Sequence, residues 1–160
     1  MARYTIGLHM ENAGRFDRLA RDLKKVGATG LRRELYAGLG RASKPIREAI
    51  IKKARQELPS SGGLNERVAT SKITAKAVPS RRGRAPSIRF MAEERSNKPI
   101  DVYALNVGKL RHPLFGNRRH WYQQRVKPGW FTQPILDGEE TFAKELGKAI
   151  DDVERQISKG

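Results

Sequence analysis

The sequence contains no cysteine, which excludes disulfide bridges and cysteine-based zinc sites and fits a reducing compartment. It also lacks long apolar runs, since no stretch approaches the roughly 18 residues that a membrane-spanning helix requires. The opening residues, MARYTIGLHM, show no basic region followed by an apolar core, so they do not predict a signal peptide. Hydrophobic residues make up 38% of the 160 residues, which predicts a single domain, residues 1–160, with a modest core.

Acidic residues are scarce, with 17 Asp and Glu against 33 Lys and Arg, and the net charge is +16. Their distribution is uneven: residues 1–131 hold 29 basic and 10 acidic residues, whereas residues 132–160 hold 4 basic and 7 acidic ones. A basic body favours polyanionic partners, DNA above all. It equally suits head-to-tail assembly, in which the acidic end of one subunit meets the basic face of the next. A solvated basic surface is the third interpretation.

The N-terminal half predicts a strand and two helices. Alternation over residues 3–10 indicates the strand, and a short helix opening at Asn12 or Gly14 is expected to end at Gly27. Thr29 is the expected N-cap of a longer helix, which Pro45 should kink or split near Ser43 and Leu58-Pro59 should close. The apolar stripes of the two helices are Phe16, Leu19, Leu23 and Val26, and Leu31, Leu35, Leu39, Ala42, Ile46, Ile50 and Ala54.

The C-terminal half predicts a short helix over 64–69, strands over 72–78 and 87–93, and a helix over 133–156. The last helix carries Phe142, Leu146, Ile150, Val153 and Ile157 on one face. Residues 99–107 are ambiguous between helix and strand. The expected fold class is α+β, with a small antiparallel β-sheet packed against a long, kinked N-terminal helix pair and a C-terminal helix.

The segment Leu110–Phe131 is the most unusual part of the chain. Its 22 residues hold both tryptophans and two of the three histidines, with five Lys and Arg and no acid. It also contains the turn-forming pairs His112-Pro113 and Lys127-Pro128. We expect an ordered loop or hairpin whose aromatic residues anchor a docking surface, because it is too aromatic for a linker and too rich in Gly and Pro for one regular element.

Catalysis has little support in this segment. The only acid within residues 101–131 is Asp101, so His112 and His120 lack an orienting carboxylate, and their spacing is no known metal-ligand pattern. We therefore expect no enzymatic activity, no metal and no cofactor.

The basic loop at 79–86, PSRRGRAP, is expected to be exposed and mobile. Its Arg81, Arg82 and Arg84 are candidates for contacting phosphates, and the competing interpretation is a solvated loop without a ligand. The aromatic residues of 110–131 could stack on bases, but packing on the subunit's own helices or on a neighbouring subunit is the favoured interpretation.

Several short motifs follow one another along the chain: Ser61-Gly62-Gly63-Leu64, His112-Pro113-Leu114-Phe115-Gly116, Trp121, Pro128-Gly129-Trp130-Phe131 and the entry to the last helix, Thr132-Gln133-Pro134-Ile135. Their order resembles the neck and tail-completion proteins of tailed bacteriophages, the group that includes the minor tail protein Z of phage lambda. The chain departs from the family where Leu105–Lys109 replaces a Gly-Thr-like stretch before the His-Pro pair.

The resemblance implies a non-catalytic virion protein that is assembled in the host cytoplasm and needs no membrane. It would form a ring, sixfold by family analogy, that joins the head connector to the tail tube and lets DNA pass. Because a strongly basic channel would hold DNA back, we expect the basic loops to face outward or toward acidic partners. The expected docking residues are His112, Pro113, Phe115, Gly116, Trp121, Tyr122, Pro128, Gly129, Trp130 and Phe131. The alternative is a free basic nucleic-acid-binding protein without catalytic activity.

Overall fold

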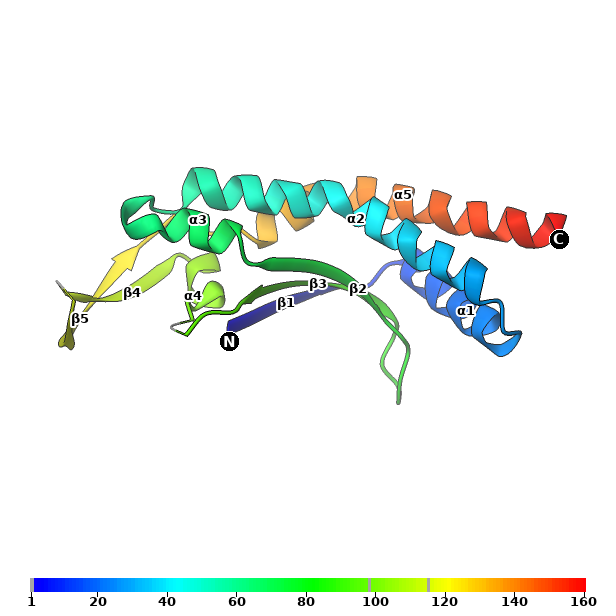
Figure 1. Ribbon diagram of the computed structural model, residues 1–160, viewed down its shortest axis with the longest axis horizontal. Helices are drawn as coiled ribbons and strands as arrows, with labels where there is room; N and C mark the ends of the chain where they lie inside the picture. The colour runs from blue at the N-terminus through cyan, green and yellow to red at the C-terminus, as the bar shows by residue number, and fades with distance from the viewer. Residues whose placement is uncertain (1, 98, 115) are drawn as a thin grey trace. The chain divides into compact units, whose positions relative to one another are not determined.

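The computed structural model describes residues 2–97, 99–114 and 116–160. The chain is α+β, with N-terminal helices and a C-terminal helix packed against a small antiparallel sheet of strand order β1-β3-β2, and with a separate two-stranded sheet (Figure 1). The elements are β1 (Ala2–Leu8), α1 (Glu11–Lys25), α2 (Thr29–Glu57), a 3₁₀ turn (Ser61–Gly63), α3 (Leu64–Ala69), β2 (Lys72–Val78), β3 (Ser87–Glu94), α4 (Val102–Asn106), β4 (Lys109–Leu114), β5 (Asn117–Arg125) and α5 (Thr132–Lys159).

The residues group into two compact units, and α2, α5 and all strands of the larger sheet contribute to both. The hairpin unit comprises Met1–Tyr4, Glu48–Ile73 and Ala92–Asp137. The helical unit comprises Thr5–Arg47, Thr74–Met91 and Gly138–Gly160. Each unit has its own buried core.

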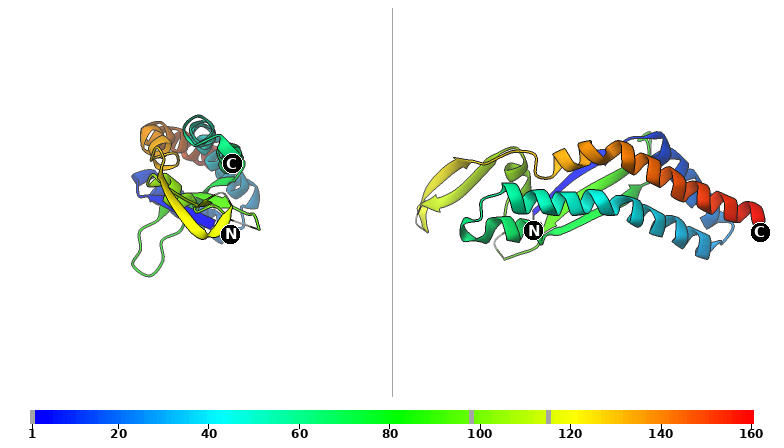
Figure 2. Two further views of the ribbon diagram at one scale, coloured as in Figure 1. Left: turned by 90° about the vertical axis from the view of Figure 1, so that its left-hand side faces the viewer. Right: turned by 90° about the horizontal axis from the view of Figure 1, so that it is seen from above.

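The helical unit is built on the contact between the N-terminal part of α2 and the C-terminal part of α5, which run side by side (Figure 2). Gly38 makes this approach possible, because a Cβ atom placed there would lie 2.7 Å from Cβ of Ala149. Phe142 of α5 contacts Phe90 of β3 edge to face, with ring centroids 5.4 Å apart. The other fully buried large side chains of this unit are Phe16, Leu35, Ile88, Leu146 and Ile150.

The first helix contacts this core through its N-terminal half. Phe16 is fully buried and meets Tyr36 of α2 edge to face at 5.1 Å. The Asn12 side chain donates a hydrogen bond to the Ala143 carbonyl of α5 at 2.6 Å. The helix α1 begins at Glu11, so Asn12 lies inside it. The predicted start at Asn12 or Gly14 is therefore corrected to a slightly earlier residue.

Two residues of the predicted stripes are exposed, and Leu19 and Leu31 are half-buried. Val26 is 77% exposed because it follows the last residue of α1, where the chain turns toward Gly27. Ile157 is 44% exposed in the last turn of α5. Apolar periodicity shows which face of a helix is buried but not where its packing partner ends. At both sites the apolar stripe therefore extends beyond the last buried contact of the helix.

Pro45 does not split α2, which continues from Thr29 to Glu57. A proline removes one backbone donor and crowds the preceding turn. Two side chains support that turn: the Ser43 hydroxyl and the Arg47 guanidinium each donate to the Gly40 carbonyl at 3.0 Å. The helix therefore passes through the proline as one element.

Replacing Gly38 with Ala is expected to destabilise the protein by about 1–3 kcal/mol, because the added methyl overpacks the α2–α5 contact. The matched control is Gly40→Ala in the same helix, where a Cβ would meet no described atom within 4 Å. That change should be neutral or stabilise by up to about 1 kcal/mol through helix propensity. Urea unfolding of both variants measures the difference, and equal stabilities would contradict the close packing at Gly38.

Candidate functional site

The segment 110–131 divides into a largely exposed hairpin and a turn that ends in two buried residues. The aromatic hairpin, residues 109–125, consists of β4 and β5 paired antiparallel, with His112 opposite Tyr122 and Pro113 opposite Trp121. The register shifts between Pro113 and Leu114, where proline has no N–H to continue the ladder. The composition of the segment predicts a loop or hairpin, and the hairpin is confirmed.

Every residue of β5 is exposed. Trp121 is 49% exposed and Tyr122 54% exposed, although both are large enough to dominate a core. Gly116 adopts a left-handed conformation, φ 77°, in the connecting turn. Phe115, another expected docking residue, lies outside the described residues. Two aromatic side chains held on an otherwise solvated strand are typical of a contact surface for another molecule.

Side chains within the hairpin hold these aromatic rings in place. The Arg111 guanidinium lies 5.0 Å from the centre of the Trp121 ring, and His112 meets the edge of Tyr122 at 5.7 Å. A cation–π contact at an exposed site contributes about 0.5–1 kcal/mol. The rings are therefore partly ordered before any partner binds, which lowers the entropic cost of association.

A groove of about 890 Å³ opens beside the hairpin. Its lining includes the apolar side chains of Leu64, Ile100, Leu105 and Leu110, with Arg111 and Trp121 at the hairpin side. The groove lies within the hairpin unit and combines an apolar lining with basic residues. Such a surface suits a partner that brings both an apolar side chain and a carboxylate.

The second part of the segment, residues 126–131, turns into the core of the hairpin unit. Trp130 and Phe131 are both 0% exposed. The Trp130 indole N–H donates to the Val102 carbonyl of α4 at 3.3 Å, and the Phe131 ring lies 5.3 Å from Tyr4 of β1. These two docking candidates therefore contribute to the subunit's own packing, and their side chains present no surface to a partner in this structure.

Asn106, the last residue of α4, organises this turn. Its side-chain oxygen accepts hydrogen bonds from the backbone N–H groups of Phe131, at 3.0 Å, and Thr132, at 3.1 Å, while its carbonyl accepts from Gly129 at 2.8 Å. It thus satisfies N–H groups at the start of α5 that no turn of that helix can bond. Asn106 cannot be identified from the sequence pattern, because a cap supplied from 26 residues away leaves no local signal.

Pro128 and Gly129 serve the same turn. Gly129 has φ 90°, a conformation that favours glycine, and its N–H is the donor to Asn106. Lys127 reaches back to α2, where its ammonium lies 2.8 Å from a carboxylate oxygen of Glu57. The hydrogen bond from Lys127, followed by that from Lys53, lowers the pKa of Glu57 below its ordinary value.

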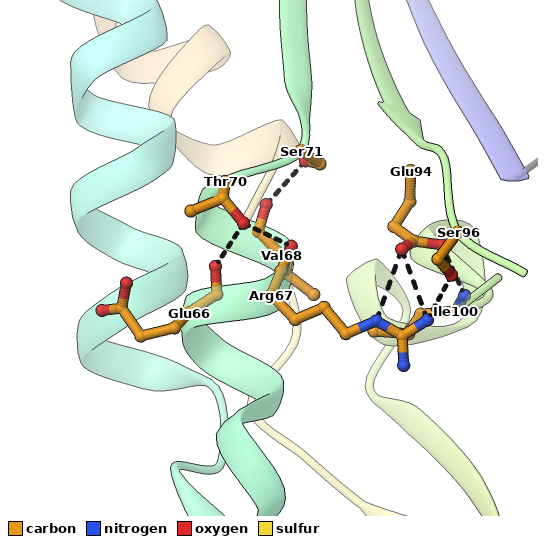
Figure 3. A network of polar contacts seen from close by, with 8 residues as sticks. All are labelled: Glu66, Arg67, Val68, Thr70, Ser71, Glu94, Ser96 and Ile100. Carbon is orange, nitrogen blue, oxygen red and sulfur yellow. Dashed lines mark hydrogen bonds and ion pairs between the residues drawn. The ribbon is translucent and has the colours of Figure 1, made fainter. Parts of the chain in front are cut away.

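The end of β3 carries two buried carboxylates with arginine partners. Glu94 is 4% exposed and accepts from the Arg67 guanidinium of α3 at 3.3 Å, from the Ser96 hydroxyl at 3.2 Å and from the Ile100 N–H at 3.0 Å (Figure 3). Its neighbour Glu93 is paired with Arg95 and Arg3. The hydrogen bond from Arg95 is the main cause that lowers the pKa of Glu93. Both carboxylates therefore bind partners within the protein and stabilise the fold.

The basic loop is a tight turn. Arg81 and Arg84 exchange backbone hydrogen bonds of 3.2 and 2.9 Å, and Arg82 and Gly83 both have positive φ, 46° and 79°. Positive φ at both central residues is the pattern of the type I′ turn that joins antiparallel strands. All three candidate arginines of the loop are exposed, as predicted.

No group of three or more His, Asp or Glu side chains arranged to hold a metal occurs among residues 2–97, 99–114 and 116–160. Within the same described part of the chain, no helix has both the length and the apolar character needed to cross a bilayer. Comparison of the chain with protein-family profiles, with curated proteins and with solved structures yields no match.

Replacing Asn106 with Ala is expected to cost about 1–3 kcal/mol of stability, because buried backbone donors at the start of α5 lose their acceptor. Asn106→Asp is the matched control, since a carboxylate keeps the acceptor and suits a helix N-terminus. Chemical unfolding at neutral pH should place the Asp variant closer to the parent protein than the Ala variant. A fully stable Ala variant would contradict the capping role.

Acidification is expected to destabilise the protein through Glu57 and Glu93. Because both pKa values are lowered on folding, their contribution is complete above the ordinary value of 4.5 and is lost as the pH falls through the folded values. The Glu57→Gln and Glu93→Gln variants should therefore lose less stability between about pH 6 and pH 3 than the parent protein does. Urea titrations across this range test the prediction, and identical pH profiles for parent and variants would refute it.

Proposed function

We propose that this protein is a structural virion component of a tailed bacteriophage. It forms a ring in the neck, between the head connector and the tail tube, that completes or attaches the tail and lets DNA pass. The observation that carries the proposal is the aromatic hairpin, which displays Trp121 and Tyr122 on an exposed strand pair without a single acidic residue. Such a surface is suited to contact with another protein subunit.

The chain also provides a surface of opposite charge. Among residues 132–160 there are 7 acidic and 4 basic residues, and Asp137, Glu139 and Glu140 lie near the start of α5. The hairpin carries Lys109, Arg111, Arg118, Arg119 and Arg125. A basic hairpin on one subunit and an acidic helix on the next form a head-to-tail contact, and a contact of that kind produces a closed ring when its rotation closes.

The resemblance to phage neck proteins supports the same reading. Of the His-Pro motif, His112, Pro113 and Leu114 lie on β4, and Trp121 lies on β5. The motif Pro128–Phe131 coincides with the turn that leads into α5, where Trp130 and Phe131 are buried. The sixfold symmetry, the connector and tail-tube partners and the virion location come from the resemblance, and they belong to the proposal on that basis.

Replacing both Trp121 and Tyr122 with Ala is expected to weaken association between subunits by at least about 30-fold, equivalent to ~2 kcal/mol, because exposed aromatic anchors dominate contact energies. Folding of the monomer should be unchanged, since both side chains are about half exposed. Sedimentation of the purified protein measures association. Tail attachment to heads, scored by electron microscopy of particles carrying the variant, measures function. Intact rings with normal tail attachment would overturn the proposal.

Charge reversal identifies the opposing surface. Arg118→Glu with Arg119→Glu should disrupt the ring, as should Glu139→Lys with Glu140→Lys, and the four changes together should restore it. Lys24→Glu with Lys25→Glu, at the end of α1, is the control of equal charge change. If that control disrupts the ring as strongly, net charge rather than a hairpin–helix contact governs assembly. Failure of the fourfold variant to recover would exclude α5 as the counterpart.

A free nucleic-acid-binding protein remains the second candidate because of one observation, a groove lined by arginines in the helical unit. The two functions differ in the state of the isolated protein. A neck protein assembles with itself or with tail components, whereas a free binding protein stays monomeric and holds DNA tightly at physiological salt.

A further inference from the structure

The helical unit contains a groove of about 990 Å³ on the exposed face of its sheet. Thr5, Gly7 and His9 reach it at alternate positions on and after β1, and Ser87 and Arg89 reach it at alternate positions of β3. This spacing follows from the period of two in a strand, which sends Leu8 and Ile88 to the opposite, buried face. The basic loop 79–86 forms the remaining wall.

The charge of the groove is of one sign. Arg81, Arg82 and Arg84 from the loop and Arg89 from β3 line it together with His9, and none of its described lining residues is acidic. Arginine presents a planar fork of N–H donors that matches the oxygens of a phosphate group and stays charged at any physiological pH. A concave surface with four such side chains concentrates positive potential where a polyanion can enter.

The loop that carries three of these arginines is fixed at its base. Asp17 of α1 is 6% exposed, and its carboxylate accepts hydrogen bonds from the Ser80 N–H at 3.3 Å and the Ser80 hydroxyl at 3.1 Å. Arg21 neutralises the same carboxylate at 2.9 Å. The loop then closes in the tight turn between Arg81 and Arg84. The arginines of the basic loop are thus held on a tight turn whose base is hydrogen-bonded to α1.

The groove differs from a protein-binding surface in what it lacks. Its apolar lining consists of Val78, Pro79 and Ala85, and no aromatic side chain lines it among the described residues. Protein interfaces use an apolar core with aromatic anchors, and base recognition needs stacking rings or groups that reach base edges. Arginines without either are suited to a partner whose recognition is mainly ionic, such as the sugar-phosphate backbone.

We propose that this groove binds the phosphodiester backbone of a nucleic acid without reading its sequence, through Arg81, Arg82, Arg84 and Arg89. The inference goes beyond the ring function and uses a different surface, since the hairpin belongs to the other unit. Each neutralised phosphate releases condensed counterions, so binding must weaken steeply with salt.

The test uses the full chain and a fluorescein-labelled duplex of random sequence, with binding followed by anisotropy over a series of NaCl concentrations. The groove variant carries Arg81→Gln, Arg82→Gln and Arg84→Gln, and the control carries Arg118→Gln, Arg119→Gln and Arg125→Gln in the hairpin. Both lose the same net charge. The slope of the logarithm of the association constant against the logarithm of the salt concentration is negative. The groove variant should reduce the magnitude of this slope by about 2–3 units, whereas the control should leave most of it unchanged. Arg89→Gln, a single change on β3, should reduce the magnitude by about 1 unit.

Two competitors separate the possible ligands. Inorganic phosphate at millimolar concentration should displace little DNA, and polyglutamate should compete less well than unlabelled duplex at equal charge. Strong displacement by phosphate would assign the groove to a free anion, and stronger displacement by polyglutamate would assign it to an acidic protein; either result overturns the proposal. An equal reduction of the salt slope in the groove and hairpin variants would also overturn the proposal, because net charge alone would then explain DNA binding.

Ring assembly provides the independent readout. The groove variant should assemble like the parent protein, whereas the Trp121 and Tyr122 variant should retain its salt-dependent DNA binding as a monomer. A groove that fails to bind DNA in a protein that still forms rings refutes this inference and leaves the proposed function standing. A protein that binds DNA through the groove but forms no rings would refute the proposed function and leave this inference standing.

Discussion

The turn at residues 126–131 is the constraint on which the hairpin unit depends. Trp130 and Phe131 are buried there, and Asn106 supplies the acceptor for the first free N–H groups of α5. The same turn ends the hairpin, since the Val126 N–H donates to the Gly108 carbonyl at 3.0 Å. Lys127 ties it to Glu57 of α2. One short stretch of chain therefore positions a helix start, the base of a projecting strand pair and the end of a long helix.

This anchoring explains how an aromatic segment can be both core and surface. The buried pair at its end contributes hydrophobic free energy and fixes direction, whereas Trp121 and Tyr122 on β5 contribute little to the fold and remain available. The basic residues serve two surfaces of different character. Those of the hairpin accompany aromatic rings and suit a protein partner, and those of the groove in the helical unit stand among small side chains and suit phosphate.

Sequence patterns recovered most elements because their signals are local. The strands β2 and β3 and the helix α3 match the predicted ranges to within one residue. The helix α2 ends where Leu58-Pro59 indicates, and it includes Thr29, the predicted N-cap, as its first residue. Periodicity failed at helix ends, where Val26 and Ile157 continue a pattern that no longer faces a partner. Of the two outcomes predicted at Pro45, a kink or a split, the split does not occur, and the Ser43 and Arg47 side chains donate hydrogen bonds to the Gly40 carbonyl beside it.

The sequence by itself determined the α+β class, the basic charge, the exposed basic loop and an ordered loop or hairpin within 110–131, since all of these follow from composition, spacing and turn residues. Only the tertiary structure decided which aromatic residues are buried and which are exposed. Trp121 and Trp130 have the same side chain, and only the contacts made by their segments place one on the surface and the other in the core. The tertiary structure also brought Asn106 to the start of α5, and His9 to the groove beside the basic loop. The members of each pair lie far apart along the chain, so only packing brings them together.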